Sequence, residues 1–256
     1  MMKNLVWNEE PVFVLTSDVD WASEYIIEFS HRLLNLKDKN VTYFNTHNSK
    51  YLNDLKKKKI IDLLIHPNFL PKSSHGDSFE EIIKTCLQFA PGSIGFRSHR
   101  YFEVNDIFDI FVNLNFKYFS NICTRCEKDL KPILHRSGLL SLPIFFEDGC
   151  YLIMDPDLRF ENIKKKLDLP GLKIFNFHPA HLAFNTPNFS YTRNIKDSLS
   201  REKWINISKK EIFSLENRKF GIRNFIEKII EFLEQKNYKY FFLDDIYNIW
   251  FNSNRG

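Results

Sequence analysis

The stretch Pro11-Val-Phe-Val-Leu-Thr-Ser-Asp-Val-Asp-Trp21 predicts a buried β-strand that ends in two carboxylates. Its residues Val12 to Leu15 are β-branched, aromatic or aliphatic, which is typical of a strand inside a sheet. Asp18 and Asp20 are two positions apart, so their side chains project from the same face of an extended chain. Because a buried carboxylate is costly unless it is paired or binds a metal, the pair marks a candidate functional site.

Similar strands recur along the chain, with helical segments between them. The expected strands are Val12–Leu15, Val41–Phe44, Ile60–Ile65, Ile94–Phe96, Phe116–Phe119, Leu142–Phe146, Lys173–Phe177 and Lys239–Leu243. The expected helices are Trp21–Asn35, Phe79–Phe89 with Ser78 as its N-cap, Val104–Leu114 and Gly221–Gln235. This alternation predicts a parallel sheet, and about seven such units favour a single-domain deformed (β/α) barrel over residues 1–256. In such a barrel the active site lies at the carboxyl ends of the strands.

Two stretches interrupt this regular alternation. Residues 151–170 and 185–216 show less regular patterns, and we expect them to be insertions around a pocket.

Composition excludes several classes of protein. The 256 residues are 43% hydrophobic, which is typical of a globular protein. A net charge of +4 is weak evidence for nucleic-acid binding, so we expect no nucleic-acid partner. We find neither a signal peptide nor the ~20 apolar residues of a membrane span, so we expect a cytoplasmic protein without a membrane span. The sequence leaves the oligomeric state open.

Four cysteines occur, at positions 86, 123, 126 and 150. Cys123-Thr-Arg-Cys126 is a lone CxxC motif, whereas a zinc ribbon needs a second such pair. A redox pair is one interpretation. Reduced bystander thiols are the favoured one, because thiols in the cytosol are kept reduced.

Polar side chains follow most of the expected strands. They are Asp18 and Asp20, His66, Arg97 and His99, Glu147 and Asp148, and His178 and His181. A single histidine in such a position is usually structural. Several histidines that converge with a carboxylate pair instead indicate a metal site with acid–base partners.

The order of these motifs resembles the polysaccharide deacetylase family of the NodB-homology, carbohydrate esterase family 4 type. A divergent bacterial branch, associated with surface-polysaccharide gene clusters, looks closer still. Its motifs His-Pro-Asn-Phe and His-Pro-x-His match His66–Phe69 and His178–His181, and Phe225–Ile246 is similar to the family's last helix and strand. The resemblance implies a metal-dependent hydrolase that removes an N-acetyl or related acyl group from an amino sugar of a surface polysaccharide or its precursor. A cytoplasmic location favours a nucleotide- or lipid-linked precursor.

The resemblance also implies a divalent metal held by Asp20, His66 and His75, with zinc as the default and cobalt or nickel as alternatives. His75 follows His66 by nine residues where the family has four, and His99 is a rival third ligand. The family's two aspartates are adjacent, whereas Val19 separates them here, so the roles of Asp18 and Asp20 could be reversed.

The remaining implied roles are catalytic or substrate-binding. Asp18 would be the catalytic base, Arg97 would hold it by a bidentate contact, and His178 would protonate the leaving amine. The family's fourth motif places Asp148 with these catalytic residues. The residues expected to bind substrate are Trp21, His99, Phe146 and His181.

Two other functions stay open on the sequence. One is a metal-dependent amidohydrolase or phosphoesterase on the same barrel, which usually has His-x-His after its first strand. The other is a non-catalytic relative that binds glycans.

Overall fold

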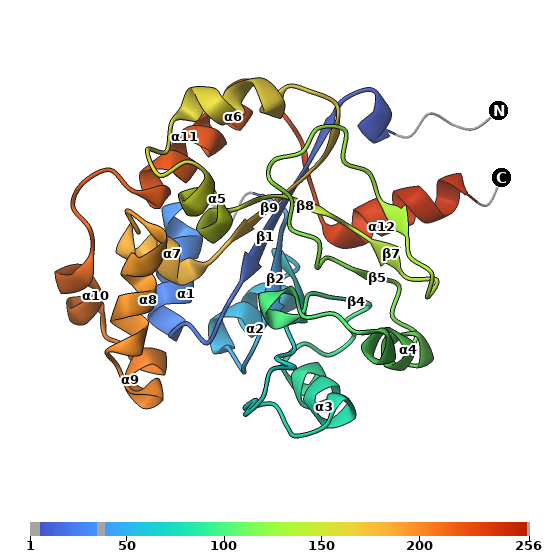
Figure 1. Ribbon diagram of the computed structural model, residues 1–256, viewed down its shortest axis with the longest axis horizontal. Coiled ribbons are helices and arrows are strands. Elements are labelled where there is room, and N and C mark those ends of the chain that lie inside the picture. Colours follow the sequence, from blue (N-terminus) through green and yellow to red (C-terminus); the bar gives the residue numbers. More distant parts are fainter. Residues whose placement is uncertain (1–5, 35–38, 255–256) are drawn as a thin grey trace.

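The strands form one curled sheet in residues 6–34 and 39–254, the part of the chain that the computed structural model describes (Figure 1). In chain order they are β1 (Pro11–Asp18), β2 (Val41–Asn45), β3 (Ile61–Ile65), β4 (Gly95–Phe96), β5 (Tyr118–Phe119), β6 (Ile133–Leu134), β7 (Leu140–Ser141), β8 (Ile144–Glu147), β9 (Gly171–Phe177) and β10 (Tyr240–Phe241). Their order across the sheet is β6-β7-β5-β4-β3-β2-β1-β9-β8, with β10 beside β1. Among these described strands only β6 and β7 pair antiparallel.

The segment after β5 brings the two sides of the sheet together. Cys123 forms a parallel bridge with Ile144 of β8, and backbone hydrogen bonds on either side of it extend the contact. The sheet therefore curls into a deformed barrel, as the alternation of strands and helices predicts. The strands that form parallel pairs are β1, β2, β3, β4, β5, β7, β8, β9 and β10.

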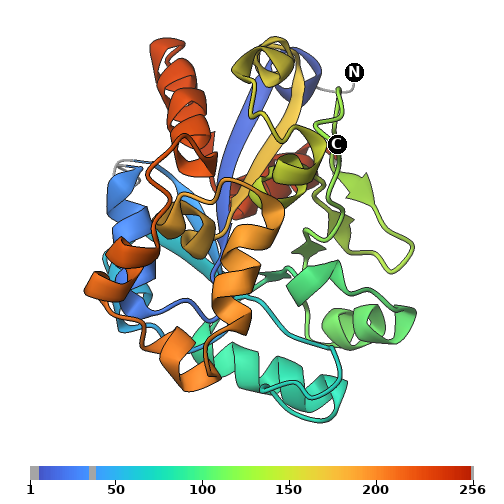
Figure 2. The ribbon, with the colours of Figure 1, turned by 60° about the vertical axis from the view of Figure 1, so that its left-hand side comes forward.

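Helices surround the sheet (Figures 1 and 2). They are α1 (Glu24–Leu33), α2 (Lys50–Lys57), α3 (Phe79–Phe89), α4 (Asn105–Asn113), α5 (Asp148–Met154), α6 (Phe160–Leu167), α7 (Pro179–Phe184), α8 (Phe189–Asp197), α9 (Arg201–Ile205), α10 (Lys209–Leu215), α11 (Ile222–Gln235) and α12 (Leu243–Ser253). The predicted cap of α3 is confirmed, because the Ser78 side chain accepts a hydrogen bond from the Glu81 amide. Asn35, the predicted end of the first helix, lies outside the described residues. None of the described helices combines the length and the apolar character of a membrane span.

Alternation along β1 sorts its side chains between two packing environments. Phe13 and Leu15 join the large apolar cluster that contains residues of the surrounding helices. Val12 and Val14 join a second cluster, in which they meet residues of the neighbouring strands and of α12. Positions 16 and 18 continue the face of Val12 and Val14 to the end of β1. Toward the carboxyl end of β1 this face therefore changes from apolar to polar.

Candidate active site

A cavity of about 480 Å³ opens at the carboxyl ends of β1, β3, β4, β8 and β9. Its lining includes Asp18, Asp20, His66, His99, Glu147, His178 and His181. Residues of α8 and Trp204 of α9 complete the wall, so the irregular stretch 185–216 does border a pocket. Figure 2 shows α8, in orange, at the front of the molecule between the blue and green segments.

Asp18 is buried at the end of β1 and is held by two partners. One carboxylate oxygen, Oδ1, accepts a hydrogen bond of 2.8 Å from Arg97, and the other, Oδ2, accepts one of 2.8 Å from the Asn176 amide. Burial opposes the charged carboxylate, but Arg97 and then His66 outweigh it, and the pKa of Asp18 is lowered. Asp18 is therefore an ionised carboxylate at neutral pH.

Arg97 is fully buried, and its guanidinium donates hydrogen bonds to residues of β1 and β9 and to Ser120, which follows β5. Its Nη1 contacts Asp18, Thr16 Oγ1 and Asn176 Oδ1, while Nε and Nη2 donate to the carbonyl and the hydroxyl of Ser120. The expected bidentate contact is wrong, because only Nη1 reaches Asp18. Asn176 takes the second carboxylate oxygen instead.

The turn after Asp18 directs the second carboxylate into the cavity. Val19 is fully buried in the large apolar cluster that contains residues of the surrounding helices, called the helix-side cluster below, and its amide donates to the Phe44 carbonyl. Asp20 and Trp21 then have positive φ angles of 49° and 57°, and the Trp21 amide donates to Thr46 Oγ1. Val19 thus anchors the turn between two carboxylates that both line the cavity.

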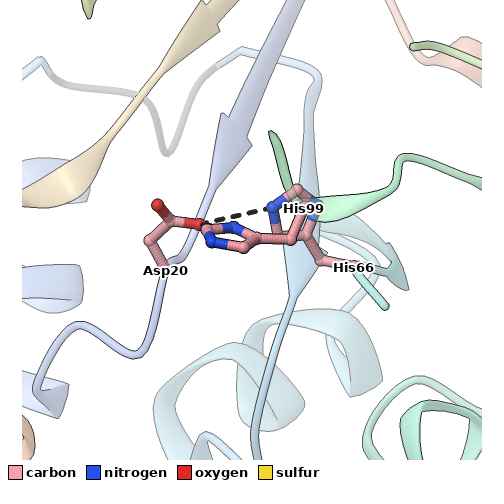
Figure 3. A group of neighbouring side chains, drawn as sticks. All are labelled: Asp20, His66 and His99. Carbon is pink, nitrogen blue, oxygen red and sulfur yellow. Dashed lines mark hydrogen bonds and ion pairs between the residues drawn. The ribbon is translucent and has the colours of Figure 1, made fainter. Parts of the chain in front are cut away.

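Asp20, His66 and His99 form a group that could hold a metal ion (Figure 3). Asp20 Oδ1 lies 3.3 Å from His66 Nε2 and 3.0 Å from His99 Nδ1. His66 Nδ1 lies 2.7 Å from the Arg97 carbonyl, to which it must donate, so Nε2 is the ring nitrogen that faces Asp20. Burial opposes the charge of Asp20, but His99 and His66 lower its pKa well below the usual range.

His75 is not a member of this group. Its Nε2 lies 2.8 Å from the Thr46 carbonyl, and its Nδ1 accepts a hydrogen bond of 3.1 Å from the Asn68 amide. Both ring nitrogens are therefore occupied by protein partners, and burial lowers the pKa of His75 to about 4. This geometry does not fit the expected ligand role of His75, and His99 replaces it in the candidate set.

His178 lies on the opposite side of the cavity, where it caps α7. Its Nδ1 is 2.6 Å from Asp148 Oδ1, and its backbone amide donates to Asp148 Oδ2 at 2.7 Å. Burial opposes the imidazolium, but the Asp148 carboxylate outweighs it and raises the pKa of His178 well above its ordinary value. The pair is a buried carboxylate with a protonated imidazole whose Nε2 is free to act.

Glu147 and His181 flank this pair. Glu147 Oε1 lies 3.3 Å from His178 Nδ1, and burial raises the pKa of Glu147 to about 8. His181 has a buried Nδ1 without a hydrogen-bond partner, and burial lowers its pKa. His181 therefore presents a neutral ring to the cavity.

The two aromatic residues expected to bind substrate differ in position. Trp21 is half-buried, packs edge-on against His99 with ring centroids 5.1 Å apart, and lines a hollow of about 440 Å³ next to the cavity. Phe146 is fully buried and packs against Tyr151, Phe175 and other core rings, so it does not line the cavity. A register shift between Ile144 and Phe146 in β8 sends Phe146 to the helix-side cluster.

Three further residues in this site were given no catalytic or metal-binding role from the sequence. Asn176 binds Asp18, Tyr101 lines the cavity with its hydroxyl 3.4 Å from Asn176, and Glu147 approaches His178. For Asn176 the sequence does carry a signal, since a polar residue two positions before His178 lies on the same face of the strand.

Comparisons with known proteins agree on one family. The model of the WbmS-like polysaccharide deacetylase family matches residues 15–196. A similar solved structure, from Bordetella bronchiseptica, is described as a polysaccharide deacetylase involved in O-antigen biosynthesis. It is 26% identical, with a TM-score of 0.72 over 86% of this chain and 89% of that chain.

Other likenesses are too weak to carry an argument. One is to a protein from Mycobacterium smegmatis described as a polysaccharide deacetylase, with 13% identity, 95% of each chain covered and a TM-score of 0.46. Another is to a carbohydrate esterase family 4 pseudoenzyme from Bacillus anthracis, with 12% identity over 93% of this chain and 66% of that chain and a TM-score of 0.44. The curated protein sequences contain no match.

Proposed function

The chain belongs to the WbmS-like polysaccharide deacetylase family, and on that premise we propose that it is a metal-dependent hydrolase that removes an N-acetyl or related acyl group from an amino sugar. The observation that carries this proposal is the content of one cavity. A group of three potential metal ligands, an ionised carboxylate and a protonated histidine all border it. A surface polysaccharide or its precursor is the proposed substrate, which the O-antigen role given for the Bordetella protein supports.

We assign the metal site to Asp20, His66 and His99. One carboxylate and two imidazoles suit zinc, and cobalt or nickel would fit the same donors. When His66 is neutral, its Nδ1 carries the proton that is donated to the Arg97 carbonyl, so Nε2 has a lone pair available for the cation. A cation bound there would polarise the acyl oxygen and make a bound water more acidic.

Asp18 is the proposed general base. It borders the cavity, and its Oδ2 lies 3.9 Å from His66 Nε2, next to the proposed ligands. Arg97 and Asn176 hold the carboxylate in place and ionised, so it can take a proton from the attacking water. In this assignment Asp18 takes the proton and Asp20 binds the metal.

His178 is the proposed general acid. Asp148 accepts the Nδ1 proton and stabilises the imidazolium, which leaves the Nε2 proton for the nitrogen of the departing amine. Asp148 also fixes the ring by accepting the His178 amide. The neutral ring of His181 and the exposed part of Trp21 are proposed to contact the sugar.

Acetate release in a metal-depleted and metal-restored preparation tests the proposal. The protein is stripped with a chelator, restored with zinc, cobalt or nickel, and offered N-acetylated amino sugars that are free, nucleotide-linked or part of an oligosaccharide. We expect acetate and a free amine only after metal is restored, and ~10²–10⁴-fold slower release from a matched Asp18→Asn preparation. A restored protein that binds these glycans yet releases no acyl group would instead be a glycan-binding relative.

A further inference from the structure

A second group of potential metal ligands lies behind the wall of the cavity that carries Glu147. The Sγ atoms of Cys123 and Cys150 and a carboxylate oxygen of Glu147 all lie within 4.8 Å of one another. Met154, one turn further along α5, places its Sδ 3.8 Å from Cys150 Sγ. Three sulfur atoms and one carboxylate therefore meet between the segment after β5, the end of β8 and α5.

The fold, and not the CxxC motif, creates this group. The bridge between Cys123 and Ile144 carries the segment after β5 alongside β8, and Cys150 follows three residues after the end of that strand. Cys126, the other cysteine of the motif, is buried in the helix-side cluster, and the group does not include it. Cys123 and Cys150 are both partly exposed, so an ion can reach them.

We propose that Cys123, Cys150 and Glu147 form a second site for a thiophilic divalent cation of the zinc or cadmium class, with Met154 or water as a further ligand. Two thiolates on one zinc ion are about 3.8 Å apart, given Zn–S bonds of ~2.3 Å and tetrahedral angles. Ligand atoms within 4.8 Å of one another need only a small contraction to reach that geometry. Thiolate and thioether sulfur favour such soft or borderline cations over magnesium or calcium.

Glu147 can serve this site while keeping its present hydrogen bonds. Its carboxylate accepts the amides of Gly149 and Cys150 at the start of α5. A bound cation would hold this carboxylate in its ionised form, and an ionised carboxylate has about four acceptor positions, so positions remain for the cation. Glu147 Oε1 also lies 3.3 Å from His178 Nδ1, so a cation here would draw negative charge away from the proposed acid. That effect on turnover rests on the proposed function, whereas binding of the cation does not.

Cadmium titration of the reduced, metal-free full chain tests the site without any substrate. We expect the wild type to bind two cadmium ions per chain and to develop an ultraviolet thiolate-to-cadmium absorption band. Cys123→Ser and Cys150→Ser should each bind one ion and lose the band. Asp20→Asn should also bind one ion but keep the band, because it affects the other site.

Cys126→Ala is the matched control, since it removes one thiol from the same motif and should leave two ions and the band. Circular dichroism of each variant establishes that it is folded. The proposal is overturned if the folded wild type shows no thiolate band, or if the band survives in both Cys123→Ser and Cys150→Ser. A band that depends on Cys126 would overturn it as well.

Discussion

Two histidine–carboxylate centres border the same cavity, and they differ in the hydrogen-bond partner of the histidine Nδ1. On one side His66 places its Nδ1 on the backbone carbonyl of Arg97, and its Nε2 approaches the half-buried carboxylate of Asp20. On the other side His178 places its Nδ1 on the fully buried carboxylate of Asp148. The first partner is neutral and the second is charged.

That difference gives the two histidines different chemical properties. A carbonyl partner fixes the tautomer of an imidazole and leaves the other nitrogen as a lone pair, which suits a metal ligand. A buried carboxylate partner stabilises the imidazolium, which suits a general acid. Residues of the same two types thus acquire different roles from their second contacts.

The largest expected effect comes from breaking the first centre. His66→Ala removes one proposed ligand, so the variant should lose bound metal and acetate release should fall by more than the ~10²–10⁴-fold typical of one acid or base. Elemental analysis of the purified variant measures the metal. His178→Ala is the control, since it should lose activity while keeping the metal. Full metal occupancy in His66→Ala would make the ligand assignment wrong.

Asp18→Asn should have the next largest effect. The amide keeps the size of the carboxylate but cannot take a proton, so kcat should fall ~10²–10⁴-fold. Metal content should stay at the wild-type level, because the proposed ligand is Asp20. Steady-state kinetics and elemental analysis on the same preparation check both parts. Loss of metal with retention of activity would show that the roles of the two aspartates are reversed.

Asp148→Asn should change the second centre from charged to neutral. In the wild type the pKa of His178 is raised, so the acid form persists to high pH and is lost only as pH rises through that pKa. Without the carboxylate, burial still lowers the pKa of His178, and only the weaker effects of Asp20 and Glu147 remain to raise it. The basic limb of the pH–rate profile should therefore move to lower pH, with a reduced rate at neutral pH. If the basic limb did not move, Asp148 would not be the group that raises the pKa of His178.

The pH dependence of the free energy of unfolding tests the same comparison in a second way. A raised pKa in the folded state adds stability that is fully present below the unfolded pKa of ~6.5 and is lost as pH rises through the folded value. Asp148→Asn should remove this contribution. Denaturant midpoints measured from pH 6 upward should therefore differ most from those of the wild type at the acidic end of that range.

Strand periodicity explains why so much of the site could be predicted from the sequence. Alternation along β1 places Asp18 on the face of Val12 and Val14, and the rule that sites lie at the carboxyl ends of strands selects His66 and His178. These predictions depend only on short extended segments. Such segments can be recognised from the local pattern of apolar and polar residues.

The sequence left the choice between His75 and His99 open and misplaced Phe146, and both outcomes depend on irregular backbone. His99 reaches Asp20 from a turn in which Arg100 and Tyr101 have φ angles of 55° and 56°, and no periodicity predicts such a turn. Phe146 leaves the cavity because β8 shifts its register between Ile144 and Phe146. Both outcomes are set by tertiary packing and not by local pattern.

His75→Ala should have the smallest effect on chemistry, and it sharpens the comparison by testing a histidine that belongs to neither centre. The variant should keep its metal and most of its activity, because His75 lies outside the group of Asp20, His66 and His99. It should lose ~1–3 kcal/mol of stability, since the Thr46 carbonyl and the Asn68 amide would be left without their buried partner.

A histidine with a folded pKa of about 4 binds its proton less readily than in the unfolded chain, so the wild type should lose stability as pH falls from ~6.5 toward 4. His75→Ala should show less of this decline, which denaturant midpoints at several pH values would measure. His99→Ala is the matched variant, and it should show the opposite pattern, with metal lost and stability little changed. If His75→Ala lost the metal and His99→Ala kept it, the ligand set expected from the sequence would be right. The hydrogen bonds of His75 to Thr46 and Asn68 would then have to break when the metal binds.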